Sequence, residues 1–177
     1  MTIGPTLETE RLRLRPPEPQ DFEPWVRFHA DKEVMTYLGG VQGRELTWRS
    51  MCGMTGAWTI SGFSMFSVIE KHTGAWIGRL GPWQPEGWPG TEVGWGLARS
   101  AWGKGYAVEG SAAAMDYAVD SLGWTEIIHT ILPENAASIR LAQRLGSRLL
   151  RQVPAPPPFE GMLWDVYGQR ANDWRSR

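Results

Sequence analysis

The sequence contains a single cysteine, Cys52, in 177 residues. One cysteine excludes a disulfide within the chain and any metal cluster held by several thiolates. Its neighbours in the segment SMCGMTG include no histidine, aspartate or glutamate that would activate the thiol. We therefore predict that Cys52 is a small buried apolar residue and not a catalytic nucleophile.

A strong charge of one sign and long apolar runs are also lacking. Eighteen Lys and Arg residues against 19 Asp and Glu residues give a formal net charge of −1, which provides no global field for binding nucleic acid. No stretch approaches the roughly 18 apolar residues of a membrane span, and no apolar N-terminal run follows a basic segment. We expect a cytoplasmic protein that binds neither nucleic acid nor membranes.

Histidine is scarce as well. The three histidines, His29, His72 and His129, lie far apart in the sequence and show none of the spacings of a metal-binding motif. We therefore expect no metal cofactor. His129 falls in the apolar run TEIIHTIL, which predicts a hydrogen-bonded core histidine and not a catalytic base.

Tryptophan and glycine, by contrast, are abundant, with 11 and 21 residues. Many of the tryptophans lie between residues 48 and 102, and several adjoin a glycine. Large flat side chains beside residues with none are suited to a shaped cleft, but tryptophans also fill cores, and the sequence leaves both interpretations open. The length and the hydrophobic fraction of 42% predict one globular domain over residues 1–177.

Hydrophobic periodicity predicts the order of the secondary-structure elements. The expected helices are one that Asp21 caps and those over 43–57, 107–122 and 137–145, and the expected strands lie at 6–16, 63–71, 73–83, 91–98, 125–132, 147–153 and 162–170. The helix between the strands at 91–98 and 125–132 suits a parallel crossover. The predicted fold class is therefore α/β (α+β), with one mixed central sheet of about seven strands and helices on both faces.

The segment RSAWGKGYAVEG, residues 99–110, leads into the helix over 107–122. Glycines at a helix N-terminus let an anion approach the unpaired N–H groups, so a phosphate group is expected there. The P-loop motif fails because Gly105 follows Lys104, and the dinucleotide motif fails because Val108 stands where its third glycine belongs. Nucleotide binding at this loop stays an alternative.

The same segment resembles the acetyl-CoA loop of the GCN5-related N-acetyltransferase (GNAT) superfamily, whose motif is Gln/Arg-x-x-Gly-x-Gly/Ala. Here SAWGKGYA places Gly103 and Gly105 in register, with Ser100 in place of Gln or Arg. The runs EVGWGLARSAWGKGYAVEG, PENAASIRLAQRLGSRL, LETERLRLRPP and HADKEVMTYLGG are similar to the branch that contains the ribosomal-protein N-terminal (alanine/serine) acetyltransferases. The resemblance spans nearly the whole chain.

This resemblance implies a GNAT fold with splayed central strands that binds acetyl-CoA. It implies that main-chain groups at Leu97 and Arg99 pair with the pantetheine arm. The pyrophosphate would rest on N–H groups of the loop, with Arg99 and Lys104 adding positive charge. The cofactor contacts expected on this basis are Leu97, Arg99, Trp102, Gly103, Lys104, Gly105, Tyr106, Ala107, Asn135 and Ser138.

Acetyl transfer to an amine requires that the amine lose a proton and that the thiolate leaving group gain one. Glu92, on the strand over 91–98, is the first candidate base, acting through water, and Glu160 in PAPPPFEG is the second. Either carboxylate could instead be solvated or ion-paired. By the resemblance, Ser138 takes the place of a tyrosine that protonates the thiolate in many relatives. Asn135 and Ser138 are equally suited to an ordinary capped helix start.

Trp83, Trp88 and Phe159, together with Glu160, are predicted to line an acceptor cleft, which implies an acceptor with an apolar or aromatic part. The expected acceptor is a primary amine, either a protein N-terminal α-amine or a small molecule. Transfer is expected to be direct in a ternary complex, because Cys52 lacks activating neighbours. A catalytically silent CoA-binding module of the same fold is the alternative, and the protein is expected to be a monomer or a homodimer.

Overall fold

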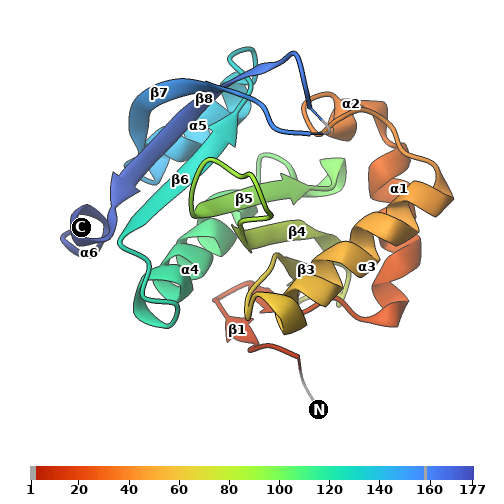
Figure 1. Ribbon diagram of the computed structural model, residues 1–177. Helices are drawn as coiled ribbons and strands as arrows, with labels where there is room; N and C mark the ends of the chain where they lie inside the picture. Colours follow the sequence, from red (N-terminus) through yellow and green to blue (C-terminus); the bar gives the residue numbers. More distant parts are fainter. Residues whose placement is uncertain (1–2, 158) are drawn as a thin grey trace.

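The computed structural model describes residues 3–157 and 159–177, and among them eight strands form one mixed sheet in the order β1-β2-β3-β4-β5-β6-β8-β7 (Figure 1). The strands are β1 (Leu7–Glu8), β2 (Leu12–Arg15), β3 (Phe66–Glu70), β4 (Trp76–Trp83), β5 (Glu92–Leu97), β6 (Glu126–Ile131), β7 (Arg148–Pro154) and β8 (Leu163–Arg170). The predicted fold class is confirmed, including the parallel crossover between β5 and β6.

Helices cover both faces of this sheet (Figure 1). They are α1 (Phe22–Ala30), α2 (Lys32–Met35), α3 (Arg44–Ile60), α4 (Tyr106–Asp120), α5 (Ala136–Arg144) and α6 (Ala171–Arg175). Apolar residues of α4 and α5 pack with Val93 and Leu97 of β5, whereas residues of α1 and α3 form a second cluster with Met65. None of the helices within residues 3–157 and 159–177 has the length and apolar character needed to cross a membrane.

The sheet gains a strand over the prediction because residues 6–16 form two short strands and not one. Thr9 N–H donates to the Leu12 carbonyl at 2.9 Å, and this turn folds Leu7 back against Leu14. The alternation of leucine and arginine predicts a single strand because the turn contains no glycine or proline to mark it.

Asp21 does not cap α1, contrary to prediction. Its carboxylate makes no cap hydrogen bond with α1 and instead pairs with the Arg15 guanidinium at 2.7 Å. It also accepts from the Ser67 hydroxyl at 2.7 Å. The carboxylate is buried, so the opposite charge and the hydroxyl of the neighbouring strands are stronger partners than helix N–H groups facing solvent.

The prediction of a buried Cys52 is wrong, because the side chain is exposed. The buried residues of α3 are Thr47, Met51, Met54 and Trp58, which recur at helical spacing. Cys52 follows Met51 by one residue, about 100° around the helix, and so points away from that face.

His129 is a buried core histidine with both ring nitrogens hydrogen-bonded, as predicted. Nδ1 lies 2.7 Å from the Val93 carbonyl and Nε2 lies 3.0 Å from the Ser147 hydroxyl. Burial lowers the pKa of His129 to about 4 from its ordinary value of 6.5. His129 therefore stays neutral in the folded protein at pH values where it is protonated in the unfolded chain.

This difference predicts a loss of stability in mild acid. Between pH 6.5 and 4 the unfolded chain binds the proton and the folded chain does not, so the free energy of unfolding falls as the pH falls. At pH 5 the loss from His129 is about 2 kcal/mol. Urea unfolding of the wild type and of His129→Gln at pH 7 and pH 5 measures this loss. If the free energy of unfolding falls equally in both proteins, His129 is not the group responsible.

Candidate active site

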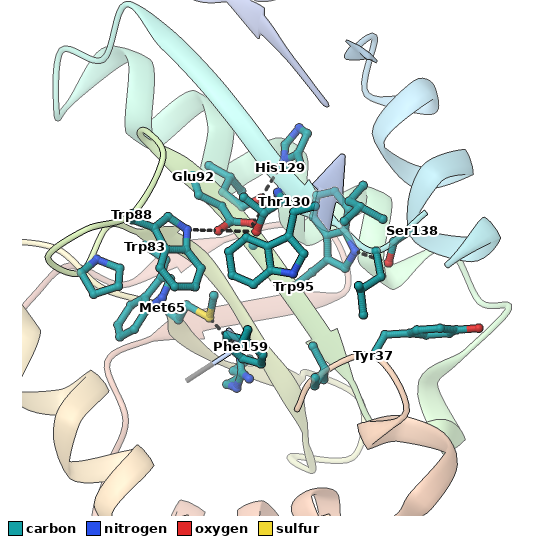
Figure 2. Close-up of a pocket in the computed structure, with 18 of the residues that line it drawn as sticks. Tyr37, Met65, Trp83, Trp88, Glu92, Trp95, His129, Thr130, Ser138 and Phe159 are labelled. Carbon is teal, nitrogen blue, oxygen red and sulfur yellow. Dashed lines mark hydrogen bonds between the residues drawn. The ribbon is translucent and has the colours of Figure 1, made fainter. Parts of the chain in front are cut away.

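A cavity of about 390 Å³ opens where β5 and β6 separate (Figure 2). These parallel strands share one register pair, Glu92 with Ile128, together with a bond from Ile128 N–H to the Thr91 carbonyl. Within the described ranges no further pair joins them. The gap between the strands is therefore lined by side chains of both strands, among them Glu92, Trp95 and Thr130.

Glu92 lies at the end of this gap where β5 and β6 are still paired. Its side chain is 5% exposed, and Oε1 accepts the Thr130 N–H and the Thr130 hydroxyl, each at 2.9 Å. The indole N–H of Trp88 donates to Oε2 (Figure 2). The carboxylate thus replaces a main-chain acceptor for β6 while it lines the cavity.

Burial raises the pKa of Glu92 above its ordinary value of 4.5. The hydrogen bonds from Thr130 and Trp88 and the positive charge of Arg79 act in the opposite direction. A carboxylate whose pKa is raised is a stronger proton acceptor in its ionised form than an exposed one. Glu92 is therefore suited to remove a proton from a group bound in the cavity.

Ser138 and Asn135 lie at the other side of the gap, at the start of α5. The Asn135 side chain accepts the Ser138 N–H at 3.2 Å, an ordinary N-cap. The Ser138 hydroxyl accepts the indole N–H of Trp95 at 3.1 Å, so its own proton remains free to be donated elsewhere (Figure 2). Both residues line the same cavity as Glu92.

Aromatic side chains form one wall of the cavity. Trp88 packs on Trp164 with ring centroids 5.0 Å apart, and Phe159 packs on the same ring at 5.2 Å. Trp83 also lines the cavity. The loop between β7 and β8, which carries Phe159, reaches the α2 end of the molecule (Figure 1). The structure thus brings the three predicted acceptor-cleft aromatics to one cavity, with Trp164 as a fourth.

Glu160 does not join them. It is exposed on the β7–β8 loop and is absent from the cavity lining of the described residues. The carboxylate is one residue beyond Phe159, and that single step directs it to solvent.

The glycine loop forms the N-terminus of α4. Gly103 and Gly105 adopt φ values of +72° and +80°, which side-chain-bearing residues rarely adopt. Gly105 is the N-cap, and no side chain of the described residues caps the helix. The first-turn N–H groups, which have no carbonyl within the helix, therefore face outward with partial positive charge.

Arg11, from the turn between β1 and β2, braces this loop and was not predicted. Its Nη1 donates to the Lys104 carbonyl at 2.8 Å, and its Nε pairs with Glu109 at 2.7 Å. The guanidinium lies over the Tyr106 ring at 4.5 Å. Only the folded chain brings residues so distant in sequence together.

The remaining predicted cofactor residues adopt local partners. Arg99 pairs with Asp31 at 3.0 Å and with Glu33 at 2.7 Å, so its charge is already balanced. The exposed Trp102 donates its indole N–H to the Leu97 carbonyl at 2.8 Å. Lys104 and Ala107 lie on the loop surface and at the first turn of α4.

Known proteins resemble this chain in both sequence and structure. Residues 11–148 match the family model described as acetyltransferase (GNAT) domain. The uncharacterized N-acetyltransferase p20 of Bacillus licheniformis is 34% identical over 165 residues, 92% of this chain and 93% of that protein. The crystal structure of an acetyltransferase from Agrobacterium tumefaciens str. C58 shares 32% identity, with a TM-score of 0.81 over 93% of this chain and 94% of that chain.

A more distant structure shares the fold. Mycobacterium smegmatis RimJ, solved in complex with CoA-disulfide, has a TM-score of 0.71 at 18% identity and covers 92% of this chain and 83% of its own.

Proposed function

Because the chain belongs to the acetyltransferase (GNAT) family and is an acetyltransferase, we propose that it moves an acetyl group from acetyl-CoA to a primary amine by direct transfer. The observation that carries this proposal is the placement of Glu92: a buried carboxylate with a raised pKa lines a cavity at the β5–β6 gap. The same strand, β5, leads into the glycine loop.

The glycine loop fits the pyrophosphate of acetyl-CoA. A Cβ on Gly103 would meet no atom of the described residues within 4 Å, so the backbone there is open to a ligand. The N–H groups at the start of α4 supply donors for phosphate oxygens and Lys104 supplies positive charge, whereas Arg11 is paired with Glu109 and holds the loop. Arg99 is less suited than its sequence position predicts, since Asp31 and Glu33 hold it.

The pantetheine arm would pair with the free edge of β5. Along β5 the main-chain groups that face β6 are those of Val93, Trp95 and Leu97. His129 occupies the Val93 carbonyl and Trp102 occupies the Leu97 carbonyl. We therefore assign the pantetheine contact to Trp95, between them.

Acetyl-CoA would supply the acetyl thioester, and this chain's residues would move the protons. Glu92 accepts the proton of the attacking amine, directly or through one water. The N–C bond forms as the C–S bond breaks, and the Ser138 hydroxyl, which is held by Trp95, donates a proton to the departing thiolate. The proton that Ser138 loses returns from solvent.

An acceptor screen with thiol release as the readout tests the proposal. Purified protein with acetyl-CoA is offered N-terminal peptides, polyamines and small amines. Acetylation of any of these, together with thermal stabilisation by CoA, supports the enzyme. Stabilisation by CoA without any acceptor would identify a silent CoA-binding module, and greater stabilisation by ATP or NAD would identify a nucleotide site.

Ser138→Ala is expected to lower kcat about tenfold or more, because a missing proton donor slows departure of the thiolate. The Kd for CoA should change less. Measuring both with the acceptor from the screen separates the two roles, and an unchanged kcat would reduce Ser138 to a packing partner of Trp95.

A further inference from the structure

Arg79 on β4 is a buried cation that forms no ion pair with a carboxylate of the described residues, and the charge of Glu92 acts on it only at longer range. Its side chain is 9% exposed, and no carboxylate of the described residues lies within 4.0 Å of it. Its Nε has no hydrogen-bond partner among these residues. Nη1 donates to the Met65 sulfur at 2.9 Å, a weak acceptor. A guanidinium with five donors is strongly disfavoured in such a place unless an anion joins it.

Arg79 lines the same cavity as Glu92. In the β4–β5 register it stands opposite Gly96, so both residues face the α1 and α3 side of the sheet, as Glu92 and Gly94 do. A Cβ on Gly94 would lie 2.7 Å from the Met65 methyl and 3.6 Å from the Glu92 carboxyl carbon. Met65 therefore contacts Arg79 through its sulfur and packs on Gly94 through its methyl group.

The two glycines leave room for neighbouring side chains that pack directly on them. A side chain at Gly96 would meet Phe28 and Leu38 at 3.0 and 3.2 Å, and one at Gly94 would meet Met65. Because Glu92 and Arg79 both line the cavity, a bound molecule can contact the two side chains together. The volume of about 390 Å³ lies at the small end of ligand pockets.

The geometry points to an acceptor that carries a carboxylate as well as its amine, an aminocarboxylate whose anionic end binds Arg79 while its amine faces Glu92. This rests on the proposed function and names its substrate class. The guanidinium fork matches a carboxylate bidentately, and the aromatic wall of Trp83, Trp88 and Phe159 packs against an apolar body. A free amino acid fits this description better than a protein N-terminus, whose carboxylate is distant or absent.

Matched pairs of amines test the charge requirement. Phenylalanine, tryptophan, β-alanine and 6-aminohexanoate are each compared with their carboxamides as acceptors, with thiol release from acetyl-CoA as the readout. We expect kcat/KM for at least one acid to exceed that of its amide about 30-fold or more, the effect of pairing a buried charge. Amidation next to the amine lowers that amine's pKa and favours the amide, so this preference cannot come from reactivity.

The variants Arg79→Met and Arg79→Lys identify the residue responsible. Arg79→Met should remove the preference by slowing the acid about 30-fold or more relative to its amide, and Arg79→Lys should restore part of it. The melting temperature of Arg79→Met should not fall, since an unpaired buried charge is removed. Arg27→Met, on the exposed face of α1, is the control.

The outcomes separate this inference from the proposed function. Acids and amides used equally, or peptides and polyamines acetylated while no amino acid is, would overturn the inference and leave the acetyltransferase. An Arg79→Met variant that is less stable and equally slow with both members of a pair would assign Arg79 a structural role. If no amine of any class is acetylated, both proposals fail.

Discussion

Replacing Glu92 with glutamine is expected to lower kcat/KM by about 10²- to 10⁴-fold while the Kd for CoA stays within a few-fold. The amide keeps the shape of the side chain and one carbonyl oxygen, which still accepts the Thr130 N–H. It cannot accept a proton from the amine at any working pH. Its NH₂ group also faces the Trp88 indole N–H, so we expect a small loss of stability in addition.

Glu160→Gln is the matched control for this experiment. Glu160 is the other carboxylate that the sequence offers as a base, but it is exposed on the β7–β8 loop. Its substitution should leave kcat/KM within about twofold, because surface substitutions away from a site have small effects. If Glu160→Gln loses activity while Glu92→Gln stays active, the general base is Glu160 on the β7–β8 loop and not Glu92.

The pH profile provides a second check on Glu92. The ionised form is the proton acceptor, so kcat/KM should rise with pH through the pKa of Glu92. Burial raises the pKa of Glu92 above 4.5. The acidic limb of the kcat/KM profile should therefore lie at a higher pH than an exposed glutamate would give. The limb should disappear from the residual activity of Glu92→Gln, and a wild-type limb at or below pH 4.5 would contradict the assignment.

Features that depend on local pattern can be predicted from the sequence. The long apolar stripe of α4 and the Gly-x-Gly start of that helix are encoded in consecutive residues, and α4 forms where expected, at Tyr106–Asp120. Alternation along β5 likewise places Glu92 and Gly94 on the face opposite Val93. Short elements such as α2 (Lys32–Met35) lack a full period of any pattern and were not predicted.

Partners that meet across the fold are beyond such patterns. Thr130 binds Glu92 only because β5 and β6 run side by side for one register pair and then part. Arg79 is a single charged residue in an otherwise apolar strand, and nothing in its neighbours signals that its head group enters the cavity. Its place in the cavity is visible only once β4 and β5 are paired and the cavity lining is assembled.

Gly105→Ala is expected to raise the Kd for CoA about tenfold or more. At φ +80° an alanine is strained by about 1–2 kcal/mol, and its Cβ would lie 3.3 Å from Nη2 of Arg11. Relief of this strain turns the first N–H groups of α4 away from a bound pyrophosphate and displaces the guanidinium that braces the loop. Titration with CoA by calorimetry measures the change.

Gly123→Ala separates the strain from the loss of binding. Gly123 has φ +70° and follows the other end of α4, and a Cβ at this position would lie more than 4 Å from every other part of the chain that the structure describes. Both variants should therefore lose similar stability, whereas only Gly105→Ala should lose CoA affinity. Equal affinities of the two variants for CoA would mean that the N-terminus of α4 does not hold the pyrophosphate. The two substitutions introduce the same backbone strain, so a lower affinity of Gly105→Ala alone is expected only if CoA binds at that end of the helix.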